Sequence, residues 1–332
     1  MNKKLKSILQ VLLSLALGFF LIWIIYKDLT EEDKQNIIES FREANYWWIL
    51  LSMVIAITSH VFRAYRWRYP LESLNIHINL PNRFAAVMIG YLANLAFPRL
   101  GEVTRCAVLT RYQKHPFEKL FGTVVAERVV DAIILVFIMI FTSILQIEIL
   151  SEFLADALGP LAEKSDAALI LIGIGVLGLG VAYLGWRFLN KSTHKFAVFF
   201  REKVHGLMDG MKSIKRMKGQ LGFYFHTAMI WIAYVVMYYV ALKAFPETAE
   251  VPFGGVMASF ALGGLTIVAV QGGLGAYPLA VMAILLLYGI NKDLGYAFGW
   301  IIWTGQTLAI ILVGFLSVLA MPLLNSKQPS DV

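Results

Sequence analysis

Apolar stretches of about 20 residues or more recur along this chain of 332 residues. A helix needs roughly 20 consecutive apolar residues to cross a bilayer. Irregular backbone is tolerated at membrane depth only where protein buries it or a wet cavity meets it, so stretches of this length predict transmembrane helices. The predicted full-length spans lie at about 7–26, 46–65, 121–147, 167–189, 221–245 and 296–322.

The composition agrees with an integral membrane protein. Apolar residues make up 58% of the chain and charged residues 15%, whereas soluble domains are closer to 45–50% and about 25%. We expect an all-α polytopic protein of the cell membrane with about six to eight transmembrane helices. One domain is predicted at 1–325, followed by a short cytoplasmic tail at 326–332. Met1–Tyr26 is interpreted as a retained first helix, because its apolar run exceeds that of a signal peptide.

The loops sort by the sign of their charge. Segments 28–43 and 148–166 are acidic, whereas 187–218 is basic. Cytoplasmic loops of membrane proteins are rich in Lys and Arg, so the N-terminus and C-terminus are predicted to be cytoplasmic. The net charge of +7 is interpreted in the same way, and nucleic acid is not an expected partner because the basic residues lie between spans.

One apolar segment is too short to cross. Segment 84–98 has about 15 residues, ends at Pro98 and has arginines on both flanks. The spans before and after it meet the same side of the membrane, so the segment is predicted to enter and return as a re-entrant hairpin. A second pair, 252–270 and 277–290, is either two crossings or a second re-entrant hairpin.

These two regions predict an inverted repeat. A span, a returning hairpin and a span occur in 46–147 and again, from the opposite side, in 221–322. The breaks share a weak signature, Pro-Arg-Leu-Gly at 98–101 and Gly-Gly-Leu-Gly at 272–275. Transporters often place broken helices at the interface of inverted repeats, near the substrate.

Ionisable residues inside apolar helices are the first candidates for a binding site. Glu127, Arg128 and Asp131 lie early in a long apolar helix, where charges usually face a cavity or a partner. One reading is an ion pair that stabilises the helix, with Arg128 as the nearest cation of both carboxylates. The other is the floor of a polar cavity that receives a headgroup or a proton.

Arginines near the ends of two segments suggest a phosphate site. Arg63 and Arg66 are either interfacial anchors or ligands of a lipid phosphate, whose oxygens match the planar guanidinium. If a helix restarts near Gly101, its first amides favour an anion. Arg99, Glu102 and Arg105 then form either a substrate site or a structural clamp.

Two further sets of residues belong to the breaks. Asn94 either satisfies broken backbone or touches substrate. The glycines after Gln271 either let helices approach closely or expose backbone to the same cavity. The candidate substrate-binding residues are Arg63, Arg66, Asn94, Arg99, Glu102, Arg105, Glu127, Arg128, Asp131, Gly272, Gly273 and Gly275.

Other chemistry is not indicated. The single cysteine, Cys106, excludes an intramolecular disulfide and a Cys-rich metal site. We see no nucleophile–base pair, no metal-ligand cluster and no nucleotide loop, so no catalytic residue, metal or cofactor is expected. Trp67 and Trp303 are interpreted as residues of the aromatic belts at the membrane interfaces.

Four motifs in this order are similar to those of a known family. RAYRW (63–67), GYLANLAFPRLGEVTR (90–105), ERVVD (127–131) and QGGLGAYP (271–278) resemble the lysylphosphatidylglycerol synthase transmembrane region family, also called flippase-like. The resemblance covers nearly the whole chain and implies a polytopic lipid-translocating module. Fused relatives add a soluble aminoacyl-transferase domain, which we do not expect here. Tyr277-Pro278 departs from the acidic residue expected after the glycine turn, so no carboxylate role carries over to that hairpin.

The leading hypothesis is therefore a flippase-like lipid transporter whose central cavity holds a polar, anionic or aminoacylated headgroup. Two alternatives stay open. One is a membrane-embedded enzyme acting on a lipid-linked substrate, which needs a fixed acid–base pair. The other is a non-catalytic membrane subunit, which predicts a stable partner; an oligomer is also compatible with the sequence.

Overall fold

A computed structural model describes most of the chain outside its two ends and one long internal segment. The described residues are 16–27, 29–97, 99–146 and 217–326. They belong to two compact units, Met1–Glu127 with Met217–Val332 and Arg128–Arg216, which we consider separately. The described residues form helices and no strand, as expected for an all-α polytopic membrane protein. The predicted span at 167–189, the acidic and basic loops beside it and Pro98 lie outside the described residues.

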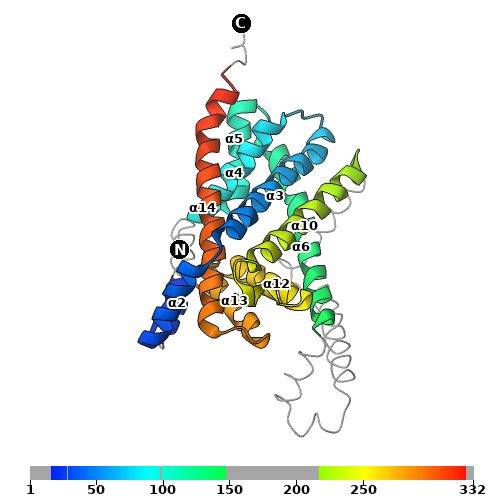
Figure 1. Ribbon diagram of the computed structural model, residues 1–332. Helices are drawn as coiled ribbons and strands as arrows, with labels where there is room; N and C mark the ends of the chain where they lie inside the picture. Colours follow the sequence, from blue (N-terminus) through cyan, green and yellow to red (C-terminus); the bar gives the residue numbers. More distant parts are fainter. Residues whose placement is uncertain (1–15, 28, 98, 147–216, 327–332) are drawn as a thin grey trace, which may run out of the picture. The chain divides into compact units, whose positions relative to one another are not determined.

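The described chain contains both long helices and shorter ones (Figure 1). Those long and apolar enough to cross a membrane are α3 (Tyr46–Glu72), α6 (Phe117–Leu145), α10 (Gln220–Leu242) and α14 (Lys292–Leu324). The shorter ones are Ala16–Lys27, α2 (Glu31–Glu43), α4 (Leu80–Ala96), α5 (Leu100–Gln113), α11 (Pro246–Ala249), α12 (Phe253–Ala269), the 3₁₀ turn η2 (Gln271–Gly273) and α13 (Ala276–Leu287).

Helix α3 is longer than its apolar stretch. The sequence predicted a span that ends at residue 65, but the helix continues to Glu72 through Pro70. Its last two turns are held by burial, since Arg66 and Trp67 are fully enclosed. Apolarity alone therefore misplaced the end of the helix, because buried polar side chains with partners continue it.

Helix α4 packs along the C-terminal half of α14. A Cβ added to Gly314 would come within 2.8 Å of Leu92, so the two backbones approach closely there. At the end of α14, the Asn325 side chain donates a hydrogen bond to Oδ1 of Asn82 at 2.8 Å. The start of α4 therefore lies beside the end of α14, and α4 runs antiparallel to it toward its middle (Figure 1).

Helix α13 packs along the other half of α14. A Cβ on Gly299 would lie 2.6 Å from the Cα of Pro278, and one on Gly295 would lie 3.3 Å from the Cα of Met282. The start of α13 is thus nearer the middle of α14, and its end is nearer the start of α14. The indole of Trp303 on α14 donates a hydrogen bond to the carbonyl of Gly272, which fixes the second break to the middle of α14.

The two breaks meet. The side chain of Gln271 donates to the carbonyl oxygens of Asn94, at 3.0 Å, and of Leu95, at 3.4 Å. Two helical hairpins, α4–α5 and α12–α13, therefore extend from opposite ends of α14 and touch at their tips. The longest helix in either hairpin has 17 residues, which is about 25 Å and less than the roughly 30 Å hydrocarbon core. This geometry favours two broken hairpins over two further crossings.

The first unit is completed by an antiparallel pair of long helices. The amide of Asn45 before α3 donates to the carbonyl of Ala244 after α10 at 3.0 Å. At the other end of the pair, Tyr69 of α3 contacts His226 of α10. Outside this pair, α2 begins with a capping box, in which the Thr30 side chain accepts from the amide of Asp33 and the Asp33 side chain accepts from the amide of Thr30.

Candidate functional site

A buried carboxylate is held between two buried arginines. Glu127 of α6 is fully enclosed. One of its oxygens lies 2.7 Å from Nη2 of Arg105 on α5, and the other lies 3.3 Å from Nε of Arg66 on α3. Ionised groups are stable away from water only when they are paired and hydrogen-bonded. The three side chains therefore tie together three helices of the first unit.

Aromatic rings cover the two guanidinium groups. Arg105 lies 4.4 Å from the ring centre of Trp67, and Arg66 lies 5.5 Å from that of Phe223. The ring faces attract the cations and keep water away from them. Trp67 itself donates from its indole to Oγ1 of Thr123 at 2.8 Å. Its assignment to an interfacial belt is therefore wrong, because the ring is fully buried beside the ion pairs.

Arg63 extends the same face of α3. It lies one helical turn before Arg66, so both side chains project from one side of the helix. Only 3% of Arg63 is exposed, and its guanidinium donates to the hydroxyl of Tyr234 on α10 at 3.2 Å. The alternative of an interfacial anchor requires an exposed head, which neither Arg63 nor Arg66 has. We call Arg63, Arg66, Arg105 and Glu127 the arginine cluster.

The partners of Glu127 correct one detail of the sequence hypothesis. Arg128 was expected to be the nearest cation of Glu127 and Asp131. Arg66 and Arg105 pair with Glu127 instead, because successive residues on a helix point about 100° apart while α3 and α5 face Glu127 directly. Arg128 does pair with Asp131, at 3.6 Å, within the second unit. That pair is exposed in part.

The first break is closed by Asn94. Its side-chain oxygen accepts from the amide of Gly101 at 2.7 Å, which satisfies one of the orphan donors at the start of α5. This is the backbone role expected for Asn94, and its contact with substrate stays a prediction. Arg99 precedes α5 in a left-handed conformation, with φ of 61°, and is exposed. Glu102 is half-buried in the first turn of α5.

The second break depends on glycine. Gly272, Gly273 and Gly275 have φ values of 60°, 73° and 70°, a region that side chains with a Cβ rarely adopt. The carbonyl of Gly272 accepts from Trp303, so it is engaged by protein. Trp303 therefore lies at the break rather than in the interfacial belt that the sequence suggested. The glycines shape the turn that presents Gln271 to the first hairpin.

Replacing Gln271 with leucine is expected to destabilise the protein by up to about 1–3 kcal/mol, the cost of leaving a buried polar group unsatisfied, because two partly buried backbone carbonyls lose their donor. Asn94 and Leu95 lie in the last turn of α4, where carbonyls have no partner within the helix. Gln306→Leu is the matched control, since that amide is bonded only weakly, to the sulfur of Met237. Thermal unfolding of the purified protein in detergent compares the variants, and equal melting temperatures would contradict a bridge between the hairpins.

The sequence did not identify several of these contacts. Tyr234 and Phe223 come from α10, far along the chain from α3, and carry no spacing signal. Among the described residues, no group of three His, Cys, Asp or Glu side chains is placed to hold a metal. The arginine side chains of the cluster are chemically suited to bind an anion, because arginine presents paired donors that match phosphate oxygens.

Comparisons with known proteins agree with the motifs. The model of the lysylphosphatidylglycerol synthase transmembrane region family matches residues 8–314. A UPF0104 membrane protein of Methanothermobacter thermautotrophicus is 22% identical over 221 residues, or 62% of this chain and 65% of the relative. Another, from Methanocaldococcus jannaschii, is 30% identical over 109 residues, or 32% of each chain. The matches thus span less than two thirds of these relatives, and no solved structure matches.

Proposed function

Since the chain belongs to the lysylphosphatidylglycerol synthase transmembrane region family, we propose that it moves a polar-headgroup lipid between the leaflets of the cell membrane. The observation that carries the proposal is the arginine cluster. Its three arginines, Arg63, Arg66 and Arg105, are buried beside the carboxylate of Glu127, and guanidinium groups offer paired donors that match phosphate oxygens.

The hairpins support the same proposal. Broken helices whose breaks lie near the middle of the membrane are the usual frame of a transporter's substrate site. Here the tips of the two hairpins touch beside the middle of α14, a helix of 33 residues and therefore about 50 Å. We propose that 46–147 and 221–322 are an inverted repeat. The lipid phosphate binds Arg63, Arg66 and Arg105, while the acyl chains stay in the bilayer.

Lipid translocation in proteoliposomes tests the proposal. Labelled anionic, zwitterionic and aminoacylated lipids are placed in one leaflet, and their appearance in the other is followed by quenching. Wild-type protein is expected to accelerate the movement of at least one of them. Arg63→Gln is expected to slow it about tenfold or more, the effect of losing a charge-assisted hydrogen bond to the headgroup.

Matched variants separate headgroup binding from folding. Arg63→Lys keeps the charge without the planar fork, so it is expected to transport at an intermediate rate. Arg42→Gln, in the exposed last turn of α2, is expected to match wild type. Transport by Arg63→Gln at the wild-type rate would remove the cluster from the mechanism. Failure of the folded wild type with every lipid would contradict lipid translocation.

A further inference from the structure

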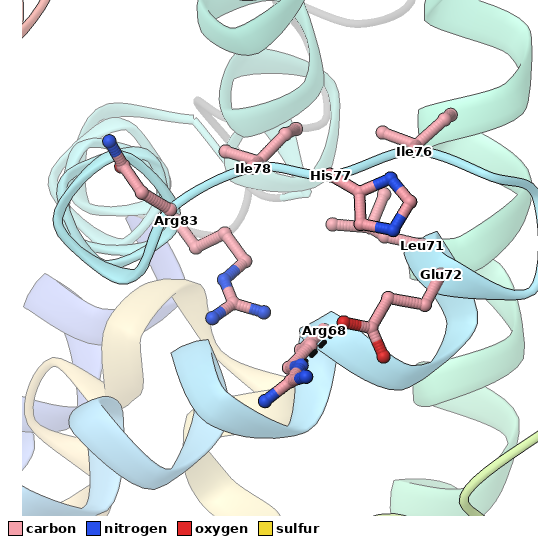
Figure 2. Close-up of a pocket in the computed structure, with 8 residues that line it drawn as sticks. Arg68, Leu71, Glu72, Ile76, His77, Ile78 and Arg83 are labelled. Carbon is pink, nitrogen blue, oxygen red and sulfur yellow. Dashed lines mark hydrogen bonds and ion pairs between the residues drawn. The ribbon is translucent and has the colours of Figure 1, made fainter.

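A polar cavity lined by no residue of the arginine cluster lies where α3 ends and α4 begins. It has a volume of about 310 Å³, at the lower end of the range for small-ligand pockets. Its charged and titratable lining residues are Arg68, Glu72, His77 and Arg83, and Figure 2 shows them around one space. We call this the α3–α4 pocket. Every residue that lines it belongs to the first unit.

Arg83 is the unusual member of the pocket. Only 5% of its surface is exposed, and its Nε atom has no hydrogen-bond partner among the described residues. Its side chain leaves the first turn of α4 and extends into the open space toward Arg68, as Figure 2 shows. A buried charged donor that lacks a partner costs free energy, and native proteins rarely keep one without a reason.

With Arg83 counted, the charged residues that line the pocket carry a net positive charge. Arg68 is already paired with Glu72, whose carboxylate lies 2.5 Å from Nε of Arg68. That pair is close to neutral, so the charge of Arg83 is left in excess. Burial lowers the pKa of Arg83, and the neighbouring charge of Arg68 lowers it further. The pocket also borders the N-terminal end of α4, whose dipole favours negative charge.

We propose that the α3–α4 pocket binds a phosphate group through Arg83, with Arg68 and His77 at its rim. The planar guanidinium offers paired donors to phosphate oxygens, which would satisfy the buried Nε atom. Asn79 and the apolar residues Leu71, Ile76 and Ile78 complete the lining. The phosphate comes either from a phospholipid headgroup or from a soluble phosphate compound, and the two sources require different experiments.

Inorganic phosphate tests the soluble source. The full chain in an uncharged maltoside detergent is titrated with sodium phosphate, with sodium chloride at equal ionic strength as reference, and binding is followed by calorimetry. Arg83→Gln is expected to weaken phosphate binding about tenfold or more. Arg111→Gln, an exposed arginine outside the pocket, is expected to leave it unchanged. Equal losses in both variants would overturn the proposal.

Phosphatidylglycerol tests the lipid source. The same micelles receive phosphatidylglycerol or phosphatidylcholine, and native mass spectrometry counts the lipids bound to each variant. Selective loss of phosphatidylglycerol from Arg83→Gln supports a headgroup in the pocket. If inorganic phosphate and phosphatidylglycerol both bind Arg83→Gln as well as they bind wild type, or bind neither protein, the pocket is not a phosphate site.

Two variants keep the test independent of folding and of the arginine cluster. Glu72→Gln removes the carboxylate that occupies Arg68, so phosphate or phosphatidylglycerol is expected to bind several-fold more tightly. Arg63 lies outside the pocket, so Arg83→Gln is expected to weaken the binding of phosphate or phosphatidylglycerol to the same extent when Arg63→Gln is also present. If that loss vanishes with Arg63→Gln, the anion is held by the arginine cluster and the proposal fails. If lipid transport fails but Arg83→Gln still weakens binding, the proposed function is contradicted and the α3–α4 pocket remains a phosphate site.

Discussion

Replacing Glu127 with alanine is expected to destabilise the protein by about 3–5 kcal/mol, the typical cost of removing one partner of a buried ion pair. The substitution leaves the guanidinium groups of Arg66 and Arg105 inside the protein without the carboxylate that both of them contact. Glu127→Gln keeps the shape and two polar atoms, so its loss is expected to be smaller. Thermal or denaturant unfolding in detergent micelles measures the difference.

Glu31→Ala is the control for Glu127. Glu31 also makes a close ion pair, 2.6 Å from Lys34 on the same helix, but 85% of its side chain is exposed. Exposed pairs contribute little, so its melting temperature is expected to stay at the wild-type value. If Glu127→Ala and Glu31→Ala unfold at the same temperature, the buried cluster does not hold the helices together.

Gly101→Ala is the second substitution with a large expected effect. A Cβ on Gly101 would overlap the carbonyl oxygen of Gly90 and come within 2.7 Å of the Asn94 side chain, because α4 and α5 approach each other there. Small residues at such crossings allow close helix packing inside membranes. Overpacking a tight contact costs about 1–3 kcal/mol, here with the further loss of the Asn94 cap.

Gly122→Ala is a control that is expected to change the stability in the opposite direction. No atom lies within 4 Å of a Cβ at Gly122 on α6. Alanine is the better helix former, so this variant is expected to gain up to about 1 kcal/mol. Calorimetry of the two proteins in the same detergent compares them. A Gly101→Ala protein as stable as wild type would show that the hairpin is packed more loosely than its backbone distances indicate.

The arrangement of the hairpins was predictable from the chain in part. Segment 84–98 was too short to cross and was flanked by arginines. These features of the sequence indicated that the chain returns to the side from which it enters, and the structure shows α5 as the second helix of this hairpin. The pair 252–270 and 277–290 stayed ambiguous, since a turn and a loop between crossings have similar sequences. The contact of Gln271 with the first hairpin joins residues about 177 positions apart, and no local pattern encodes it.

The arginine cluster was likewise predictable from the sequence only in part. The sequence singled out Arg63, Arg66, Arg105 and Glu127 because charge inside apolar helices is costly and usually functional. It assigned the wrong partner to Glu127, because i,i+3 and i,i+4 neighbours on one helix are the only contacts that spacing reveals. Helix α3 also continued past its apolar stretch, since Arg66 and Trp67 found partners on other helices.

The sequence by itself determined the membrane class, the helical content, the lengths of most helices and the residues whose charge needs compensation. These follow from local properties, namely the hydropathy of a segment and the cost of a charge within it. Only the tertiary structure decided that the hairpin tips meet beside the middle of α14, that two arginines share Glu127 and that Arg83 faces an open pocket. Those contacts join helices distant in sequence, and side-chain packing, which no periodicity records, selects them.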